Sequence, residues 1–306
     1  MQTEDRFLSV VWAPEWTPGV ALLKLKYETT MIDGEPEHLK LPHSFTKYEQ
    51  YVQWLRDRNI GAELPWGDRA YLVKHEDIQN RLQRVPLNAI DLTRQEIPPD
   101  ALDPLLQCLE QAGIETSRAF LTCSWIASMA RPDSDFDVAI EADIKQMSAI
   151  RGVIRRKIGS FEFLPPMNSS TWKRLCSCGK DSEKLVSEGR FLETFCVKSA
   201  GTAAQISIIY LRSKNDIVFA SAPEEQAEVI DISGTVICDD ESNYKPSRYV
   251  LRDADGNETS VICWHKWGGL VKNGDRVRIT CARVESDKVI YLQMDPEKHV
   301  IRWLNW

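Results

Sequence analysis

Two aspartates at the start of one apolar run constrain the fold of this chain more than any other feature. Ser134-Asp135-Phe136-Asp137 leads directly into Val138-Ala139-Ile140, and this pattern predicts a strand over residues 135–142. Alternate residues of a strand point to the same face of its sheet. Asp135 and Asp137 therefore project two carboxylates side by side where the strand begins. Paired carboxylates suit divalent cations that hold a phosphorylated ligand.

Elements of alternating type surround this strand. A helix is expected over residues 101–112, with Gly113 as its stop, followed by a strand over 118–122. The helix after the aspartates has a periodic apolar stripe, expected on its core side, of Ile144, Met147, Ile150, Ile154 and Ile158. Later segments predict strands over 160–164, 204–211 and 216–220, and helices over 169–175 and 182–195. Residues 98–222 are therefore expected to form an α/β layer with one sheet.

The flanking regions differ from this layer in composition and pattern. Residues 1–97 are predicted to be a mixed α/β domain, with strands over 7–12, 20–27 and 69–73 and helices over 48–58 and 75–82. Residues 223–306 contain five short strand-like runs, over 229–238, 249–252, 260–264, 275–284 and 289–293. Turn signals separate these runs, as in a small five-stranded β-barrel of the OB type. The predicted fold class is α+β multidomain, with an α/β core between a mixed N-terminal region and an OB-like C-terminal barrel.

Composition narrows the class of protein. The chain has 306 residues, of which 43% are hydrophobic, so a normal core can form. No apolar run approaches the roughly 18 residues of a membrane span, and the polar start of the chain argues against a signal peptide. Eight cysteines in a chain of this length do not make a disulfide scaffold. We therefore expect a cytoplasmic protein with reduced thiols and no membrane partner.

The positive charge is concentrated in one segment, although the formal net charge is -7. Residues 151–180 contain one acid, Glu162, and seven basic residues: Arg151, Arg155, Arg156, Lys157, Lys173, Arg174 and Lys180. Two interpretations stay open. The segment can be a solvated helix face, or it can bind phosphates or a nucleic-acid backbone beside the carboxylates.

Residues 118–142 resemble the motif of the nucleotidyltransferase fold, the superfamily of DNA polymerase beta. Ser124 matches the motif serine, and Ser134, Asp135 and Asp137 match its acidic half. The whole layout is similar to that of archaeal predicted nucleotidyltransferases of unknown role. Two departures concern the phosphate loop, because Cys123 and Ser128 stand where the motif has glycines that allow close backbone approach.

The resemblance implies a third metal-binding carboxylate on a later strand, beside the aspartate pair. Glu162 is the best-placed candidate. An alternative alignment places the position on the strand over 204–211, which offers only Gln205 and Ser207, and Asp216 is a third option. Glu141 shares the strand face of the two aspartates but lies about 13 Å along from Asp137, at roughly 3.3 Å per residue.

The resemblance implies a metal-dependent nucleotidyltransferase that moves an NMP from ATP or another NTP to a hydroxyl of RNA, another nucleic acid or a protein. Asp135, Asp137 and Glu162 then hold Mg²⁺ or Mn²⁺ as the catalytic and metal-binding residues. The residues expected to contact the nucleotide are Ser124, Ser134, Arg155, Arg156, Lys173 and Arg174. The alternative is a catalytically degenerate member that serves as a nucleic-acid or protein binding module. A third possibility is a nucleic-acid chaperone that uses only its OB-like domain.

Cysteine and tryptophan positions outside the motif favour structural roles. Cys176, Cys178 and Cys196 lack the paired Cys-x-x-Cys spacing of a zinc site, so free thiols are expected. Trp303 and Trp306, at the end of the sequence, are expected to be docked apolar anchors. The sequence specifies neither the base preference nor the oligomeric state.

Overall fold

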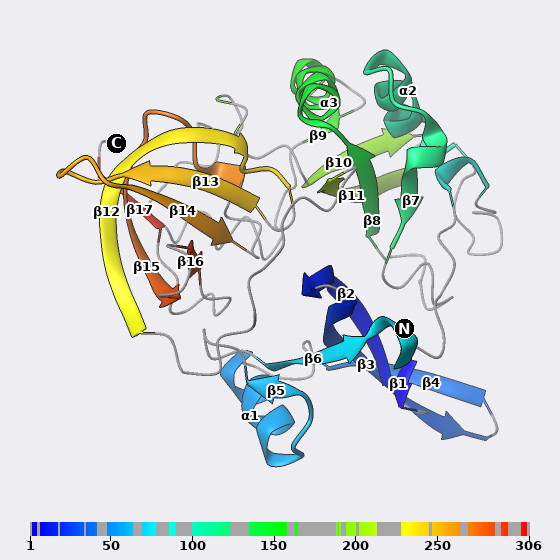
Figure 1. Cartoon of the computed structure of the whole chain (residues 1–306). Coiled ribbons are helices and arrows are strands. Elements are labelled where there is room, and N and C mark those ends of the chain that lie inside the picture. The colour runs from blue at the N-terminus through cyan, green and yellow to red at the C-terminus, as the bar shows by residue number, and fades with distance from the viewer. Residues whose placement is uncertain are drawn as a thin grey trace.

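The computed structural model has a mixed α+β fold with few helices and several sheets (Figure 1). The structure describes residues 2–4, 7–17, 19–33, 35–41, 48–63, 69–77, 86–89, 100–122, 135–157, 163–164, 188, 190, 194–199, 202–212, 228–244, 247–263, 269–284, 289–292 and 301–304. Its three sheets each fall within one of the three regions predicted from the sequence. Short 3-10 turns cover His75–Asp77, Leu87–Ala89 and Thr116–Arg118.

The first sheet is built on a long antiparallel hairpin. Its strands are β1 (Gln2–Glu4), β2 (Phe7–Thr17), β3 (Val20–Ile32), β4 (Glu35–Lys40), β5 (Ala62–Glu63) and β6 (Arg69–Lys74). Strands β2 and β3, which include the strands expected over 7–12 and 20–27, pair as this hairpin. Helix α1 (Tyr48–Asp57) buries Tyr51, Val52 and Leu55 against Leu25, and the Tyr51 hydroxyl donates a hydrogen bond to the Leu25 carbonyl at 2.7 Å.

The second sheet contains the aspartate pair. Its order is β7-β8-β11-β10-β9, and only β8 and β11 among its described neighbours run parallel. The strands are β7 (Ala119–Leu121), β8 (Phe136–Ala142), β9 (Phe163–Leu164), β10 (Thr194–Ser199) and β11 (Thr202–Arg212). Helices α2 (Asp103–Gln111) and α3 (Ile144–Lys157) complete this α/β layer.

Local signals set the ends of both helices. After α2, Gly113 has φ +68°, and the amides of Gly113 and Ile114 bond back to the carbonyls of Glu110 and Leu109, as in a Schellman motif. Before α3, Asp143 and Gln146 form a reciprocal capping box through their side chains and amides. The predicted helix stop at Gly113 is therefore confirmed.

One face of the second sheet packs against both helices. Phe136, Val138 and Ile140 alternate along β8 into a core that also contains Leu105 of α2 and Ile150 of α3. Burying such side chains contributes about 1.5–3 kcal/mol each. The opposite face of β8 consists of Asp135, Asp137, Ala139 and Glu141, and we call it the carboxylate face.

Two sequence predictions in this region are wrong. The helix expected over 182–195 ends in residues that are strand, because Thr194 and Phe195 begin β10 and pair with Ser207 and Ile206. The hairpin partner β11 follows closely in the chain, so tertiary pairing overrides local propensity. Ile144 was expected on the core side of α3, but this first residue of the helix is 44% exposed. The strand predicted over 216–220 and the helix over 169–175 lie outside the described residues.

The third sheet contains the five predicted strands and one more. Its strands are β12 (Glu228–Glu241), β13 (Ser247–Arg252), β14 (Glu258–Cys263), β15 (Arg276–Val284), β16 (Val289–Leu292) and β17 (Ile301–Trp303). The pairings run β12-β13-β14-β16-β15-β17, and β15 also pairs with β12. Sequence patterns did not indicate β17, which is only three residues long. Trp303 packs against the core of this sheet, as expected for a docked anchor.

Tyr244 joins the third sheet to the second. Its side chain is buried in the core of the second sheet, and its hydroxyl donates to the Ala142 carbonyl at 2.8 Å. The Arg212 guanidinium lies 4.6 Å from the centre of the Tyr244 ring and forms an ion pair with Glu241 at 2.8 Å. The residues after β12 are thus held by the ends of β8 and β11.

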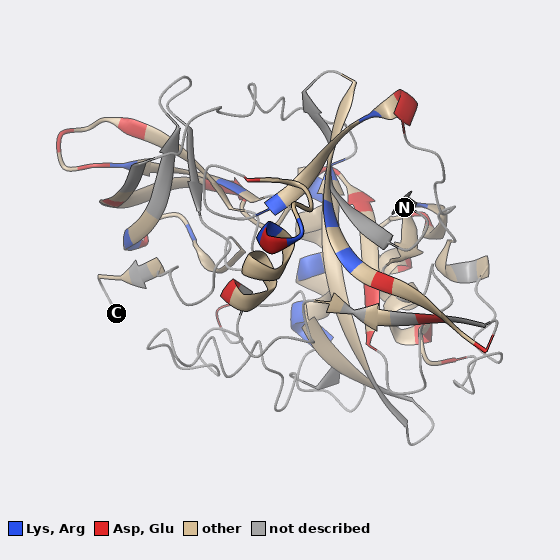
Figure 2. Cartoon of the chain, turned by 90° about the horizontal axis from the view of Figure 1, so that it is seen from below, with Lys and Arg blue, Asp and Glu red and all other residues tan. Residues whose placement is uncertain are grey.

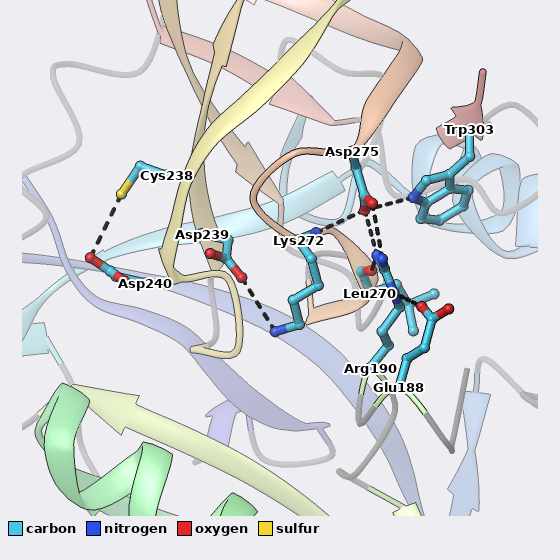
Figure 3. A network of polar contacts seen from close by, with 9 residues as sticks. All are labelled: Glu188, Arg190, Cys238, Asp239, Asp240, Leu270, Lys272, Asp275 and Trp303. Atoms are coloured by element: carbon cyan, nitrogen blue, oxygen red, sulfur yellow. Dashed lines mark hydrogen bonds and ion pairs between the residues drawn. The ribbon is translucent and has the colours of Figure 1, made fainter. Parts of the chain in front are cut away.

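A buried ion pair joins Arg190, which precedes β10 in the chain, to Asp275, which directly precedes β15 (Figure 3). Arg190 donates from Nη1 and Nη2 to the Asp275 carboxylate, at 2.5 and 3.0 Å, and from Nη1 to the Leu270 carbonyl. Asp275 also accepts hydrogen bonds from the Lys272 amide and the Trp303 indole, both at 2.9 Å. Burial alone raises the pKa of Asp275, but these donors lower it below its ordinary value.

Lys272 lies beside this pair, with its ammonium 3.4 Å from the Asp239 carboxylate. Burial, with a contribution from nearby Arg151, lowers its pKa to about 8. The unfolded chain therefore binds more protons than the folded protein between about pH 8 and 10.5, so stability rises with pH in that window.

From pH 7.5 to 9.5, the free energy of unfolding in urea is expected to rise by about 1–2 kcal/mol more in wild type than in Lys272→Met. Equal rises in the two proteins would contradict this assignment.

No described helix is long and apolar enough to cross a membrane.

Candidate functional site

The site begins with Asp137 of β8 and with Asp135, which directly precedes this strand. Both carboxylates are partly exposed, while Phe136 between them is buried. The alternation expected from the sequence is therefore present, and both acids belong to the carboxylate face. Glu141 belongs to the same face farther along β8 and is also partly exposed.

Thr122, at the end of β7, fixes the backbone at the second aspartate. Its amide and its hydroxyl both donate to the Asp137 carbonyl, at 2.8 and 3.1 Å. These two hydrogen bonds to one carbonyl hold the start of β8 against the end of β7. The Asp137 side chain therefore extends from a backbone held in place, and a binding site requires such fixed positions for its groups.

Ser207 is the residue next to Asp137 on the neighbouring strand. The parallel register pairs Phe136 with Ile206 and Asp137 with Ser207, so Ser207 and Gln205 belong to the carboxylate face. Ser207 is 3% exposed, and its hydroxyl lies 3.4 Å from that of Thr194 on β10. A row of one carboxylate and two hydroxyls thus crosses three strands.

Helix α3 follows β8 and carries two predicted phosphate contacts, Arg155 and Arg156, in its last turn. Arg155 and Arg156 are exposed in that turn, on the side of the sheet opposite the carboxylate face.

Arg151, in the same basic run, is buried rather than solvated. It is 7% exposed, and burial lowers its pKa, opposed by Tyr210 and Asp239. Burial also raises the pKa of the Tyr210 hydroxyl. The interpretation of the basic run as a wholly solvated helix face is therefore wrong for Arg151, which follows the buried Ile150.

Five of the predicted site residues lie outside the described part of the chain: Ser124, Ser134, Glu162, Lys173 and Arg174. Glu162 immediately precedes β9, and β10 and β11 separate β9 from β8. At about 4.8 Å between strands, β9 is about 14 Å from β8. The roles of these five residues stay predictions.

The donor set of the site suits one divalent cation with a phosphorylated ligand. Mg²⁺ is usually bound through one or two carboxylates, with phosphates and water completing six oxygens, and Asp135 with Asp137 provides two. Within the described residues, no three His, Cys, Asp or Glu side chains gather as a metal group. Four described cysteines are free thiols: Cys108, Cys196, Cys238 and Cys263.

Charged residues of both signs are interspersed over the described elements (Figure 2). Several form pairs on the third sheet, among them Arg252 with Glu258 at 2.6 Å and Arg278 with Asp231 at 2.7 Å. These exposed pairs contribute about 0–1 kcal/mol each.

No protein-family model, no curated protein and no solved structure matches this chain.

Sequence reasoning named Ser207 only as a neutral residue of an alternative alignment and did not consider Thr194. The alternative alignment was the sequence feature that could have identified Ser207, because it places the strand over 204–211 beside the aspartates. The signal for Thr194 was absent, because its segment was predicted to be helical.

Proposed function

We propose that this chain is a nucleotidyltransferase-type protein that binds a nucleoside triphosphate together with Mg²⁺ or Mn²⁺ through Asp135 and Asp137. The observation that carries the proposal is the placement of both carboxylates, partly exposed, on one sheet face where β8 begins. The fixed backbone at Asp137 adds support, since it orients the second carboxylate.

Each group has a role in this binding. Asp135 and Asp137 would hold the cation beside the phosphates of the nucleotide. The resemblance implies that the phosphates are contacted by Ser124, Ser134, Arg155, Arg156, Lys173 and Arg174. The bound cation supplies charge neutralisation and Lewis acidity.

Two functions can follow from this binding. The motif favours transfer of the NMP to a hydroxyl of RNA, another nucleic acid or a protein. The neutral Ser207 beside Asp137 favours binding without efficient transfer, because it adds no third anionic ligand. We infer the second: a nucleotide-binding module whose transfer activity is weak.

The third sheet is proposed to be an OB-type barrel that contacts a nucleic acid. Its five longer strands pair in the order β12-β13-β14-β16-β15, with β14 and β16 parallel. The pairing of β15 with β12 returns the order to its first strand, which supports this proposal.

The proposal is tested with α-labelled NTPs, Mg²⁺ or Mn²⁺ and total RNA. We expect wild type to retain labelled nucleotide on a filter, with little label transferred to RNA or protein. Asp135→Ala/Asp137→Ala is expected to lose retention by at least about tenfold, the effect of removing about 1.4 kcal/mol of binding. Glu141→Ala is the matched control, because it removes a carboxylate from the same face of β8 at a distance, and it should bind as wild type does.

Two results would count against this function. Equal nucleotide retention by the double variant and wild type would overturn binding at these aspartates. Efficient label transfer that requires both aspartates would replace the binding module with the transferase.

A further inference from the structure

We propose that Ser207 limits the aspartate site to one divalent cation, so that a bound nucleotide is held without transfer. This inference rests on the proposed function, and it names the residue that sets the stoichiometry of the site. Its basis is the pairing of β8 with β11.

The pairing of β8 with β11 places Ser207 next to Asp137. A side chain at this position could act as a further ligand of a cation that Asp137 binds. The two residues are register partners on adjacent parallel strands, which lie about 4.8 Å apart. Both belong to the carboxylate face. Ser207 is buried, and its hydroxyl lies 3.4 Å from the Thr194 hydroxyl, so a neutral hydroxyl pair borders the two carboxylates.

The rest of the described face beside the aspartates is neutral as well. Gln205 directly precedes Ile206, the register partner of Phe136, and Cys196 of β10 pairs with Gln205. The described residues of β10 and β11 that border the site on this face are Thr194, Cys196, Gln205, Ser207, Ile209 and Leu211. None of these six described residues is anionic, so the negative charge at this end of the described face comes from the β8 segment, through Asp135 and Asp137.

Charge and ligand number then decide how many cations can bind. Two cations in one site lie about 3.5–4 Å apart and repel each other, so anionic ligands must bridge them. Two carboxylates balance the two charges of one Mg²⁺, whose other ligands are phosphate oxygens and water. A hydroxyl at Ser207 does not offset the repulsion of a second cation.

A single cation accounts for binding without transfer. In transfer, the acceptor oxygen bonds to the α-phosphorus, and the bond from that phosphorus to the bridging oxygen breaks. Pyrophosphate leaves with the electron pair, and the acceptor proton passes to solvent. One cation neutralises the leaving phosphates, but none is left to lower the pKa of the acceptor hydroxyl. A carboxylate at position 207 would hold that second cation.

The test counts bound Mn²⁺ per bound ATP analogue by equilibrium dialysis, with a non-hydrolysable analogue at saturation. Wild type is expected to retain one Mn²⁺ per nucleotide. Ser207→Asp is expected to retain two and, with ATP, to transfer label at least about tenfold faster, which is about 1.4 kcal/mol of barrier. Ser207→Asn is the uncharged control of matched size and should retain one.

A second variant tests the inference even if a carboxylate at the buried position 207 prevents folding. Gln205 is partly exposed, so Gln205→Glu places a carboxylate on the carboxylate face with little burial, and it should also raise the ratio to two. Two Mn²⁺ per nucleotide in wild type would overturn the inference. So would a ratio of one in folded Ser207→Asp and Gln205→Glu. A wild-type chain that binds no nucleotide would instead overturn the proposed function itself, and this inference with it.

Discussion

Replacement of Asp275 by alanine is expected to lower the free energy of unfolding by about 3–5 kcal/mol, because it leaves the buried Arg190 guanidinium without its bidentate partner. Arg190 keeps its ion pair with Glu188 at 2.5 Å, but the exposed side-chain fractions of Arg190 and Asp275 are 11% and 6%, so water replaces little of the lost bidentate pairing. Lys272 and Trp303 lose an acceptor in the same change. The measurement is urea unfolding followed by circular dichroism at pH 7.

The matched control for Asp275 is Asp231, on the same sheet. Asp231 pairs with Arg278 at 2.7 Å, but both side chains are about half exposed. Asp231→Ala should therefore cost no more than about 1 kcal/mol. Similar losses in the two variants would contradict the role given to the buried pair.

Tyr244→Ala is expected to cost about 3–5 kcal/mol, since it empties an aromatic position in the core of the second sheet. Tyr244→Phe keeps the buried ring and removes only the hydrogen bond to Ala142, so it should cost about 1 kcal/mol. Both free energies come from the same urea titrations. A cost below 1 kcal/mol for Tyr244→Ala would show that the second and third sheets do not depend on this contact.

The sequence predicted the elements around the aspartates well, because local pattern and tertiary burial agree there. Strand β8 was expected over 135–142 and covers Phe136–Ala142, with alternate apolar residues buried as the pattern required. Helix α3 follows from a stripe of apolar residues at helical spacing and a capping box at Asp143. In both elements, one face is apolar and the other polar.

Other features depend on contacts between distant segments, which no local pattern encodes. Strand β10 forms because Thr194–Ser199 pairs with β11, although its sequence also fits a helix. Arg151 is buried although it belongs to a basic run, and its neighbours Tyr210 and Asp239 come from strands distant in sequence. The position of Ser207 beside Asp137 depends on the register of two strands that are far apart in sequence.

Calorimetric titration of ATP into the wild-type chain, with and without Mg²⁺, tests the central claim most directly. Binding through Asp135 and Asp137 requires the cation, because two carboxylates repel the phosphates when no cation lies between them. We predict saturable binding with Mg²⁺, weakened at least about tenfold by EDTA and abolished in Asp135→Asn/Asp137→Asn. Equal affinity with and without Mg²⁺, or in the double variant and wild type, would contradict the account.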